Sequence, residues 1–402
     1  MLRLRAAVLV LCTASTTGCV ETAGEVEPLG SEVRDSAGIV IVENEAPHPT
    51  SRLPWAIEPE PFVTIGAVEG DPAYQLFGVE DALRLDDGRI LVANGGSSEI
   101  RVFDASGTHL DSWGGEGEGP GEFVGLTDVM RWPGDSIVAG DFRTYRLTIY
   151  DSRGRRGRTL GLTLGDELGP GTAVGVLPDG HVLVQSQISW TQQERVTALV
   201  RRSRDYVLLD AAGNGAANYG RHQDEEYFIR GEEMAILRHP FRRSLHPAAW
   251  GERVVIAPSD RYEIRAYDRE GELTAIVRRD HDLVPPTQAD LDEQNEARLA
   301  ELDPDERPSM ARLFEGMPLV EAFPAFSRVL ADATHHLWVK EYTKPRDDTS
   351  IWTVFDPDGR VLGLVETPPG LLVYDIGTDY LLGRATDDLD VEYVQLWRLT
   401  RG

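Results

Sequence analysis

The feature that most constrains the fold of this chain is a short motif that returns five times. Each copy has an aromatic residue or leucine, then an aspartate, two further residues and a glycine. The copies are at 103–107, 150–154, 209–213, 267–271 and 355–359. The apolar residue ends a buried strand, the aspartate accepts bonds from turn amides, and the glycine takes a positive φ. Each copy therefore predicts a tight turn after a buried strand.

A hairpin with alternating apolar residues precedes each motif. The first has turn residues at 86–88 between apolar runs at 82–85 and 90–93. A sixth, degenerate unit covers 371–399. Units of about four strands cannot bury both faces alone, so they must pack around a ring. The sequence predicts an all-β fold: one six-bladed β-propeller with four-stranded antiparallel blades.

The sixth unit ends after its third strand, so closure of the ring needs a strand from elsewhere. Two N-terminal segments have strand character, 38–43 and 61–66. Strand exchange between the chain ends would remove an exposed edge. We expect one of them to complete the sixth blade, with 61–66 the better placed, and the other to pack beside it.

A helical insertion is predicted at about 286–318, between the fourth and fifth blades. Thr287 precedes an acidic residue at Asp290, as at a helix N-cap. An apolar stripe at helical spacing follows, formed by Met310, Leu313, Phe314 and Met317. The stripe is expected to dock on the propeller as core, and a lid over the central channel is the alternative.

The N-terminus has the pattern of an export leader. Arg3 and Arg5 precede a short apolar run at 6–11, and small residues lead to Cys19. The run is too short to span a bilayer. We expect residues 1–18 to be removed, residues 19–36 to form a flexible acidic tether, and residues 37–402 to form the propeller. The chain has 2 cysteines, both near this leader, so a disulfide scaffold and a cysteine nucleophile are not expected.

Two segments resemble known families. Residues 16–19 resemble the lipobox of bacterial lipoproteins, which implies a diacylated Cys19 and attachment to the membrane through that lipid. Residues 117–123 resemble the inter-blade segment of NHL-repeat proteins, and residues 36–399 are similar to bacterial six-bladed propeller lipoproteins. The resemblance implies a place in the cell envelope, periplasmic or facing the outer membrane. It implies little about activity, since NHL-like propellers include protein binders, nucleic-acid binders and a few lyases or lactonases.

The charge argues against nucleic acid as a partner. Acidic residues number 67 and basic residues 40, giving a formal net charge of −27. Nucleic-acid binding needs a broad basic face that neutralises phosphates. The sequence offers no sign of such a face.

Catalytic motifs are absent from the sequence: it contains neither Gly-x-Ser-x-Gly nor Ser-x-x-Lys. Repeat register, however, puts Asp81 and Asp128 at equivalent positions, preceded by Glu80 and Thr127, while His246 is one residue out of register. These groups could converge at one channel mouth and hold a divalent cation. Alternatively, they cap loops and accept bonds from backbone amides.

Three functions remain open from the sequence. We favour a non-catalytic binding or scaffold protein without a cofactor, whose partner is an envelope protein, a peptide or a glycan. The second is a metal-dependent hydrolase or lactonase at the channel mouth, and the third a structural envelope component. The sequence does not specify the ligand or the oligomeric state.

Overall fold

The computed structural model describes residues 30–188, 196–344 and 349–402. In this part of the chain the strands form six sheets, joined by two α-helices and two short 3-10 helices, η1 (Pro72–Tyr74) and η2 (Gly95–Ser97). The all-β prediction is confirmed. Sheet 1 contains β5 (Val79–Arg84), β6 (Ile90–Asn94), β7 (Glu99–Phe103) and β8 (His109–Gly114). Sheet 2 contains β9 (Leu126–Trp132), β10 (Ser136–Asp141), β11 (Arg146–Tyr150) and β12 (Arg156–Gly161). Sheet 3 contains β13 (Gly171–Val176), β14 (Val182–Ser186), β15 (Ala198–Leu209), β16 (Gly215–Arg230) and β17 (Ala235–Arg238).

The second half of the chain, with the N-terminal strands, supplies the other three sheets. Sheet 4 contains β18 (Leu245–Trp250), β19 (Arg253–Pro258), β20 (Glu263–Tyr267), β21 (Leu273–Arg279), β2 (Ile39–Asn44) and β1 (Ser31–Ser36). Sheet 5 contains β22 (Phe326–Ala331), β23 (Leu337–Glu341), β24 (Ser350–Phe355) and β25 (Val361–Thr367). Sheet 6 contains β26 (Leu372–Ile376), β27 (Tyr380–Thr386), β28 (Glu392–Thr400), β3 (Ala56–Ile57) and β4 (Val63–Ile65).

The repeated motif builds the turn between the third and fourth strands of a sheet. In sheet 1 the Asp104 carboxylate accepts hydrogen bonds from the amides of Ser106 and Thr108, both at 2.9 Å. Gly107 has φ 85°, a conformation that glycine adopts without a steric penalty. Phe103, which ends β7, is fully buried. The turn chemistry expected from the motif is therefore present.

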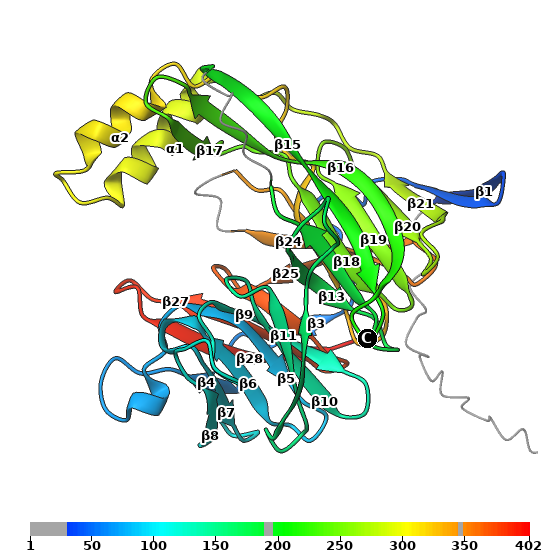
Figure 1. Ribbon diagram of the computed structural model, residues 1–402. Helices are drawn as coiled ribbons and strands as arrows, with labels where there is room; N and C mark the ends of the chain where they lie inside the picture. The colour runs from blue at the N-terminus through cyan, green and yellow to red at the C-terminus, as the bar shows by residue number, and fades with distance from the viewer. Residues whose placement is uncertain (1–29, 189–195, 345–348) are drawn as a thin grey trace, which may run out of the picture.

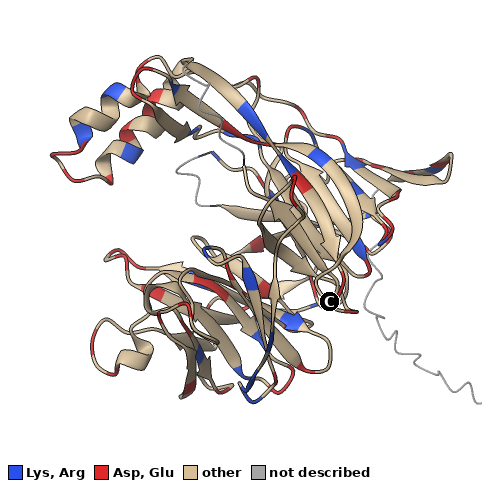
Figure 2. Cartoon of the chain, viewed as in Figure 1, with Lys and Arg blue, Asp and Glu red and all other residues tan. Residues whose placement is uncertain are grey.

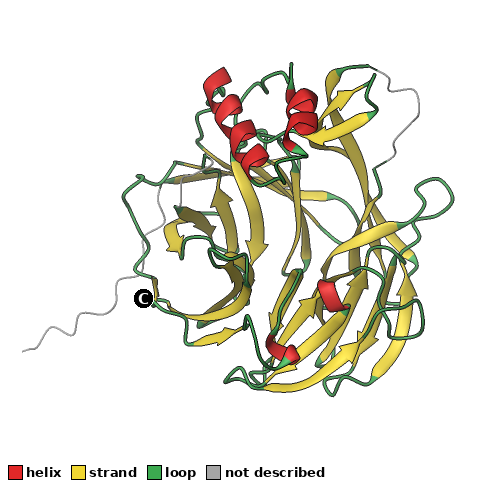
Figure 3. Cartoon of the chain, turned by 90° about the vertical axis from the view of Figure 1, so that its left-hand side faces the viewer, coloured by secondary structure: helices red, strands yellow, loops and turns green. Residues whose placement is uncertain are grey.

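The apolar core consists of clusters that each join two successive sheets. Shared clusters contain Leu83 and Val129 (sheets 1 and 2), Val138 and Val182 (2 and 3), Leu183 and Ile256 (3 and 4), Val255 and Phe326 (4 and 5), Trp338 and Leu381 (5 and 6), and Leu382 and Ile90 (6 and 1). The last cluster returns to the first sheet, so the sheets follow one another around a ring, as in a β-propeller. Figure 3 shows the strands arranged about a common centre.

An N-terminal strand completes sheet 6, as expected. In β4, Val63, Thr64 and Ile65 pair antiparallel with β28, opposite Leu396, Gln395 and Val394. Ile65 is fully buried in the cluster shared with sheet 1. The C-terminal and N-terminal segments are thus joined by backbone hydrogen bonds, which leaves no free edge on β28.

The other N-terminal segment does not pack beside the closing strand, so that part of the prediction is wrong. β2 pairs in parallel with β21, the outer strand of sheet 4, and β1 folds back on β2 as a hairpin. The side-chain amide of Asn44 fixes this position, donating to the carbonyls of Arg278 (2.9 Å) and Gly359 (3.0 Å). Residues 31–36 belong to β1, so the expected tether 19–36 is wrong for these residues. Sheets 3, 4 and 6 also have more strands than the four expected.

The two helices, α1 (Gln288–Ala300) and α2 (Arg307–Phe314), lie between β21 and β22 in sequence. Thr287 and Asp290 form a reciprocal capping box at the start of α1, as expected. Phe314 and Met317 pack in a cluster with Phe228 of β16. The stripe therefore serves as core against the long hairpin of sheet 3, beside which the two helices lie (Figure 1).

Candidate binding site in the central channel

The sheet register gives each inner strand one position that corresponds to Asp81. Asp81 lies opposite Ala93 on the neighbouring strand. The corresponding pairs in other sheets are Asp128 with Gly140, Thr172 with Gln185, His246 with Ala257, and Arg328 with Lys340. All five inner-strand residues keep part of their surface accessible, although the strands around them are largely buried. We refer to these positions as the upper level of the channel.

His246 is in register with Asp81, which corrects the sequence prediction. The hairpin of sheet 4 pairs Trp250 directly with Arg253, whereas Arg84 of sheet 1 pairs with Ile90 across a longer turn. Counting from the turn therefore misplaced His246 by one residue. The level of a side chain in the channel is set by the backbone pairing of its strand and not by its distance from the turn.

Asp81 is held by backbone amides of two sheets. Its Oδ1 accepts a bond from the amide of Ala82 (2.8 Å) and its Oδ2 from the amide of Val129 (3.0 Å). Burial and the nearby Asp128 raise the pKa of Asp81 well above its ordinary value, while Arg328 lowers it only to a lesser extent. The carboxyl thus joins sheet 1 to sheet 2 and favours its neutral form.

Asp128 lies within range of this carboxyl but has partners of its own. Its Oδ2 accepts a bond from the hydroxyl of Thr127 at 2.6 Å. Burial raises the pKa of Asp128; the Thr127 bond opposes this, and the Glu80 carboxylate adds to it. Among the residues with described positions, no three His, Cys, Asp or Glu side chains are grouped so that they could hold a metal ion. The contacts of Asp81 match the amide-bonding role that the sequence left open, whereas Asp128 accepts its bond from a hydroxyl.

His246 lies apart from the two aspartates in its interactions. Its Nε2 is 3.2 Å from the Ser244 hydroxyl, and its ring is 5.4 Å from that of Phe326. Burial lowers the pKa of His246 to about 4, and the positive charge of Arg328 acts in the same direction. The imidazole is therefore neutral at pH 7 and faces a cation.

That cation, Arg328, was missed by the sequence reasoning. It is half-buried, its partial removal from water lowers its pKa, and its guanidinium carbon is 5.9 Å from the ring centre of Tyr374. Across the residues the structure describes, its guanidinium makes no hydrogen bond or ion pair. Lys340 lies directly opposite, and burial together with Arg328 lowers its pKa. Register alone would have revealed Arg328, because Leu337 starts β23 as Ile90 starts β6.

Closer to the hairpin turns of the inner strands, at what we call the lower level, an ion pair links two sheets. Arg131 of β9 reaches past sheet 1 to Asp375 of β26, with Nη1–Oδ1 at 3.1 Å and Nη2–Oδ2 at 3.0 Å. Its Nη2 also donates to the Arg84 carbonyl (2.7 Å) and the Tyr380 hydroxyl (3.2 Å). Burial disfavours the charged form, but the Asp375 carboxylate outweighs it and raises the pKa of Arg131. Three sheets are thus tied together by one guanidinium.

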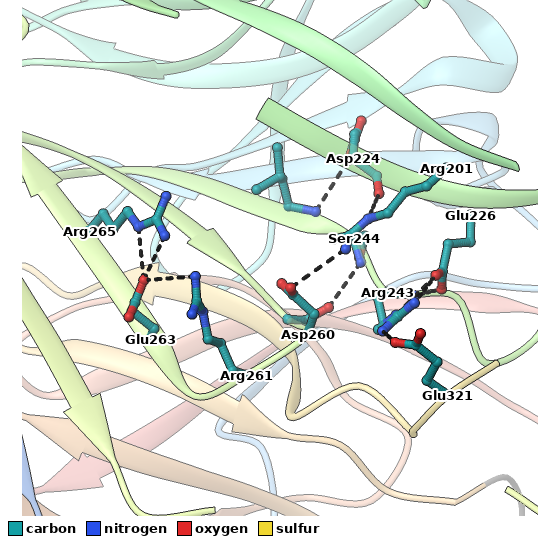
Figure 4. A network of polar contacts seen from close by, with 12 residues as sticks. Arg201, Asp224, Glu226, Arg243, Ser244, Asp260, Arg261, Glu263, Arg265 and Glu321 are labelled. Carbon is teal, nitrogen blue, oxygen red and sulfur yellow. Dashed lines mark hydrogen bonds and ion pairs between the residues drawn. The ribbon is translucent and has the colours of Figure 1, made fainter. Parts of the chain in front are cut away.

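A polar network connects the β15–β16 hairpin of sheet 3 to sheet 4, beside the upper level. Arg243, at the start of sheet 4, forms ion pairs with Glu226 of β16 and with Glu321, the latter at 3.0 Å. Arg201 of β15 pairs with Asp260 at 3.6 Å, and the Asp224 carboxylate accepts the amide of Leu245 at 3.2 Å (Figure 4). These contacts hold the extended β15–β16 hairpin, and with it α1 and α2, onto sheet 4.

The predicted lipidation site, Cys19, lies outside the described residues. Among the described residues, no helix combines the length and the apolar character that crossing a membrane requires.

Comparison with known proteins gives likeness in fold. No protein-family model matches the chain, and no curated protein matches it in sequence. It resembles the crystal structure of a protein described as exported, from Bacteroides fragilis NCTC 9343, with a TM-score of 0.51 and 13% identity over 90% of this chain and 99% of that one. A member of the duf4221 family from Bacteroides vulgatus ATCC 8482 gives 0.49 and 9% over 87% and 99%. The β-propeller domain of Cps50 (Swd1) from Myceliophteria thermophila gives 0.36 and 11% over 80% and 96%. At these identities the first likeness supports a shared fold alone.

Proposed function

We propose that this protein is a six-bladed β-propeller, lipid-anchored at the bacterial cell envelope through Cys19, that binds a ligand at the mouth of its central channel without converting it. One observation carries the binding proposal. The upper level brings charged and polar side chains from several sheets to one partly accessible space, and Arg328 among them is unpaired. Ligand sites combine such convergent polar groups with apolar surroundings.

Apolar side chains at the same mouth support the proposal. Phe77 precedes β5 and is 75% exposed, Phe142 follows β10 and is 43% exposed, and Leu389, in the turn between β27 and β28, is 77% exposed. Each of these segments lies at the strand ends nearest the upper level. A ligand at the mouth would cover some of this apolar surface, which favours binding by roughly 25 cal/mol for each Å² removed from water.

Metal-dependent hydrolysis at the same mouth is the second candidate. Asp81 and Asp128 favour it because the charge of Asp128 disfavours the ionised form of Asp81, a repulsion that a cation would relieve. Against it, both oxygens of Asp81 already accept backbone bonds. We therefore rank it below binding.

Thermal unfolding of the mature protein in detergent tests the two candidates together. The probes are phosphate, citrate, glucose 6-phosphate, glucose, trehalose, spermidine, and the chlorides of Ca²⁺, Mn²⁺ and Zn²⁺. Binding predicts that at least one of the non-metal probes, phosphate included, raises the melting temperature saturably, because it binds the folded state alone. Thr172→Trp, which fills the upper level, should abolish the shift, and Thr163→Trp, at an exposed position, should not.

Two outcomes would contradict the binding proposal. If none of the non-metal probes, phosphate included, shifts the transition, no ligand of these classes binds. If a metal ion does so, and Asp81→Asn combined with Asp128→Asn abolishes the shift, the hydrolase becomes the better candidate.

The lipid anchor has its own test. Cys19→Ser should move the protein from the detergent phase to the aqueous phase on phase partitioning, because no acyl chain can then be attached. Unchanged partitioning of the variant would reject the lipid anchor and leave the channel proposal untouched.

A further inference from the structure

Buried arginines in this protein normally meet a carboxylate. Arg279 pairs with Glu341 at 2.8 Å, and Arg401 pairs with Asp332 at 2.9 Å. Both pairs are largely shielded from water. Such pairing is expected, because an isolated buried charge is costly and a guanidinium can donate five N–H bonds. Arg328, which is half-buried, departs from this pattern, because among the described residues no carboxylate pairs with its guanidinium.

The polar groups around Arg328 are engaged in other hydrogen bonds, and among the described residues none of them accepts a bond from its guanidinium. The nearest carboxyl group that influences it, Asp81, has its two oxygens on the amides of Ala82 and Val129. The Tyr374 hydroxyl donates to the carbonyl of Val79 at 2.8 Å. At 5.9 Å the Tyr374 ring is at the outer limit of a cation–π contact, so it borders the guanidinium without replacing a partner.

Lys340 adds a second cation at the same place. It lies directly across from Arg328 on β23, where side chains of an antiparallel pair point to the same face. Among the ion pairs of residues 30–188, 196–344 and 349–402, none includes the Lys340 ammonium. Two basic side chains thus lie side by side within a chain of net charge −27, and the acidic group that acts on Arg328 is Asp81, whose own pKa is raised well above its ordinary value. Figure 2 shows acidic and basic residues interspersed over the rest of the ribbon.

We propose that the upper level of the channel binds an oxyanion, a carboxylate or phosphate group, held by the Arg328 guanidinium with Lys340 beside it. This rests on the proposed binding function and names the chemistry of its ligand. The planar guanidinium matches two oxygens of a carboxylate or phosphate, and the ammonium supplies a point charge. Tyr374 offers a flat apolar border for the body of the ligand. The site has a built geometry on rigid strands, so binding needs no rearrangement of the backbone.

Titration of the mature protein with phosphate, citrate and succinate, at constant ionic strength set by chloride, tests this. Binding is followed by thermal unfolding and by calorimetry. We expect at least one of these anions to bind saturably. Arg328→Met should weaken binding roughly tenfold or more, because it removes charge-assisted hydrogen bonds. Lys340→Met should weaken it less, and Arg328→Lys should fall between wild type and Arg328→Met, since it keeps the charge but loses the planar fork.

The matched control is Arg155→Met, which makes the same change in net charge at an exposed pair with Asp151 outside the channel. It should leave anion binding unchanged. Phosphate is titrated separately from the two carboxylates, citrate and succinate. The anion that binds more tightly shows which oxyanion the site prefers.

The possible failures point to different conclusions. If glucose, trehalose or spermidine binds in a manner abolished by Thr172→Trp while no anion does, the binding function stands and the oxyanion inference is rejected. If anions bind equally well to Arg328→Met, they associate elsewhere on the surface, and the inference is also rejected. If no probe of any class binds, both proposals fall.

Discussion

Arg131 and Arg328 lie on inner strands of the same ring, yet their surroundings are opposite. Arg131 donates to a carboxylate, a carbonyl and a hydroxyl, and through them links sheet 2 to sheets 1 and 6. Arg328, three sheets away in the chain, has a like charge opposite it and no acceptor. One cation lies at the lower level of the channel and the other at the upper level.

Arg131 stabilises the fold through these contacts, whereas Arg328 has no comparable contact among the described residues. The Arg131–Asp375 pair joins two guanidinium nitrogens to two carboxylate oxygens, and with its other bonds it contributes cohesion among three sheets. At the upper level Arg328 stays partly accessible and, among the described residues, makes no hydrogen bond or ion pair, so its charge is available to a ligand.

The pH dependence of stability at the upper level is the largest expected effect. His246 has a folded-state pKa of about 4, below its ordinary 6.5, so the unfolded chain binds a proton first as the pH falls. Its contribution is present above pH 6.5 and is lost as the pH falls toward 4, by up to about 3 kcal/mol. Arg328, Arg242, Glu225 and the Ser244 hydroxyl are the groups that face it.

Urea unfolding at pH 7 and pH 4 of the wild type and of His246→Gln measures this loss. The variant should lose less stability between the two pH values, because glutamine does not titrate. His48→Gln, at an exposed position, should behave as the wild type. Equal losses in wild type and His246→Gln would mean that the upper level is not the desolvated, cationic environment described.

Arg131→Met should lower the free energy of unfolding by about 2 kcal/mol. A fully buried pair loses about 3–5 kcal/mol when one partner is removed, but the Arg131 side chain is 47% exposed and its pairing is partly screened. The loss arises because the Asp375 carboxylate, 12% exposed, is left without its partner. Adding Asp375→Asn should restore part of the stability. Urea unfolding checks both, and full additivity of the two changes would contradict a direct pair.

The sequence predicted the fold well because the fold is local. Each motif such as Phe103 with Asp104 builds its own turn, and each hairpin buries its apolar residues against the next sheet, so repetition alone indicates the ring. The capping box at Thr287 was predicted for the same reason. The strand with which 38–43 pairs was not predicted, because sheets 4 and 6 each have an edge strand that could pair with it. The choice depends on tertiary contacts such as those of Asn44.

The candidate site was predicted only in part. Asp81, Asp128 and His246 were found from repeat register, and all three lie at the upper level. Their partners could not be predicted, because the amide of Val129 and the hydroxyl of Ser244 reach them through packing. Arg328 was not predicted, because arginine is not a residue type that binds metal ions. The same register nevertheless places it at the level of Asp81.

Lys340→Gln should raise the free energy of unfolding by about 0.5 kcal/mol. Like charges directly opposite each other on paired strands are destabilising, and glutamine keeps most of the side chain's length without the charge. Urea unfolding in low and high salt measures the gain, which should shrink as salt screens the repulsion. A loss of stability would show that Lys340 has a partner in solution and that the upper level is not a region of uncompensated positive charge.

Arg328→Met makes the same chemical change as Arg131→Met, and its expected effect is the smallest, within about 0.5 kcal/mol of wild type. Methionine retains much of the apolar stem, which is the part of an arginine that packs, and no hydrogen bond is lost because none is made. Relief of the repulsion with Lys340 offsets the remaining loss of packing, so Lys340→Gln should give little further gain in stability in the Arg328→Met background.

Urea unfolding of both methionine variants compares the same substitution in two places. Any difference in their free energies of unfolding therefore comes from the surroundings of each arginine. If Arg328→Met cost as much as Arg131→Met, the guanidinium at the upper level would be a structural tie like the one below it, and the contrast between the two levels would disappear. If Arg131→Met lowers the free energy of unfolding and Arg328→Met leaves it nearly unchanged, the charge of Arg328 does not contribute to the stability of the fold.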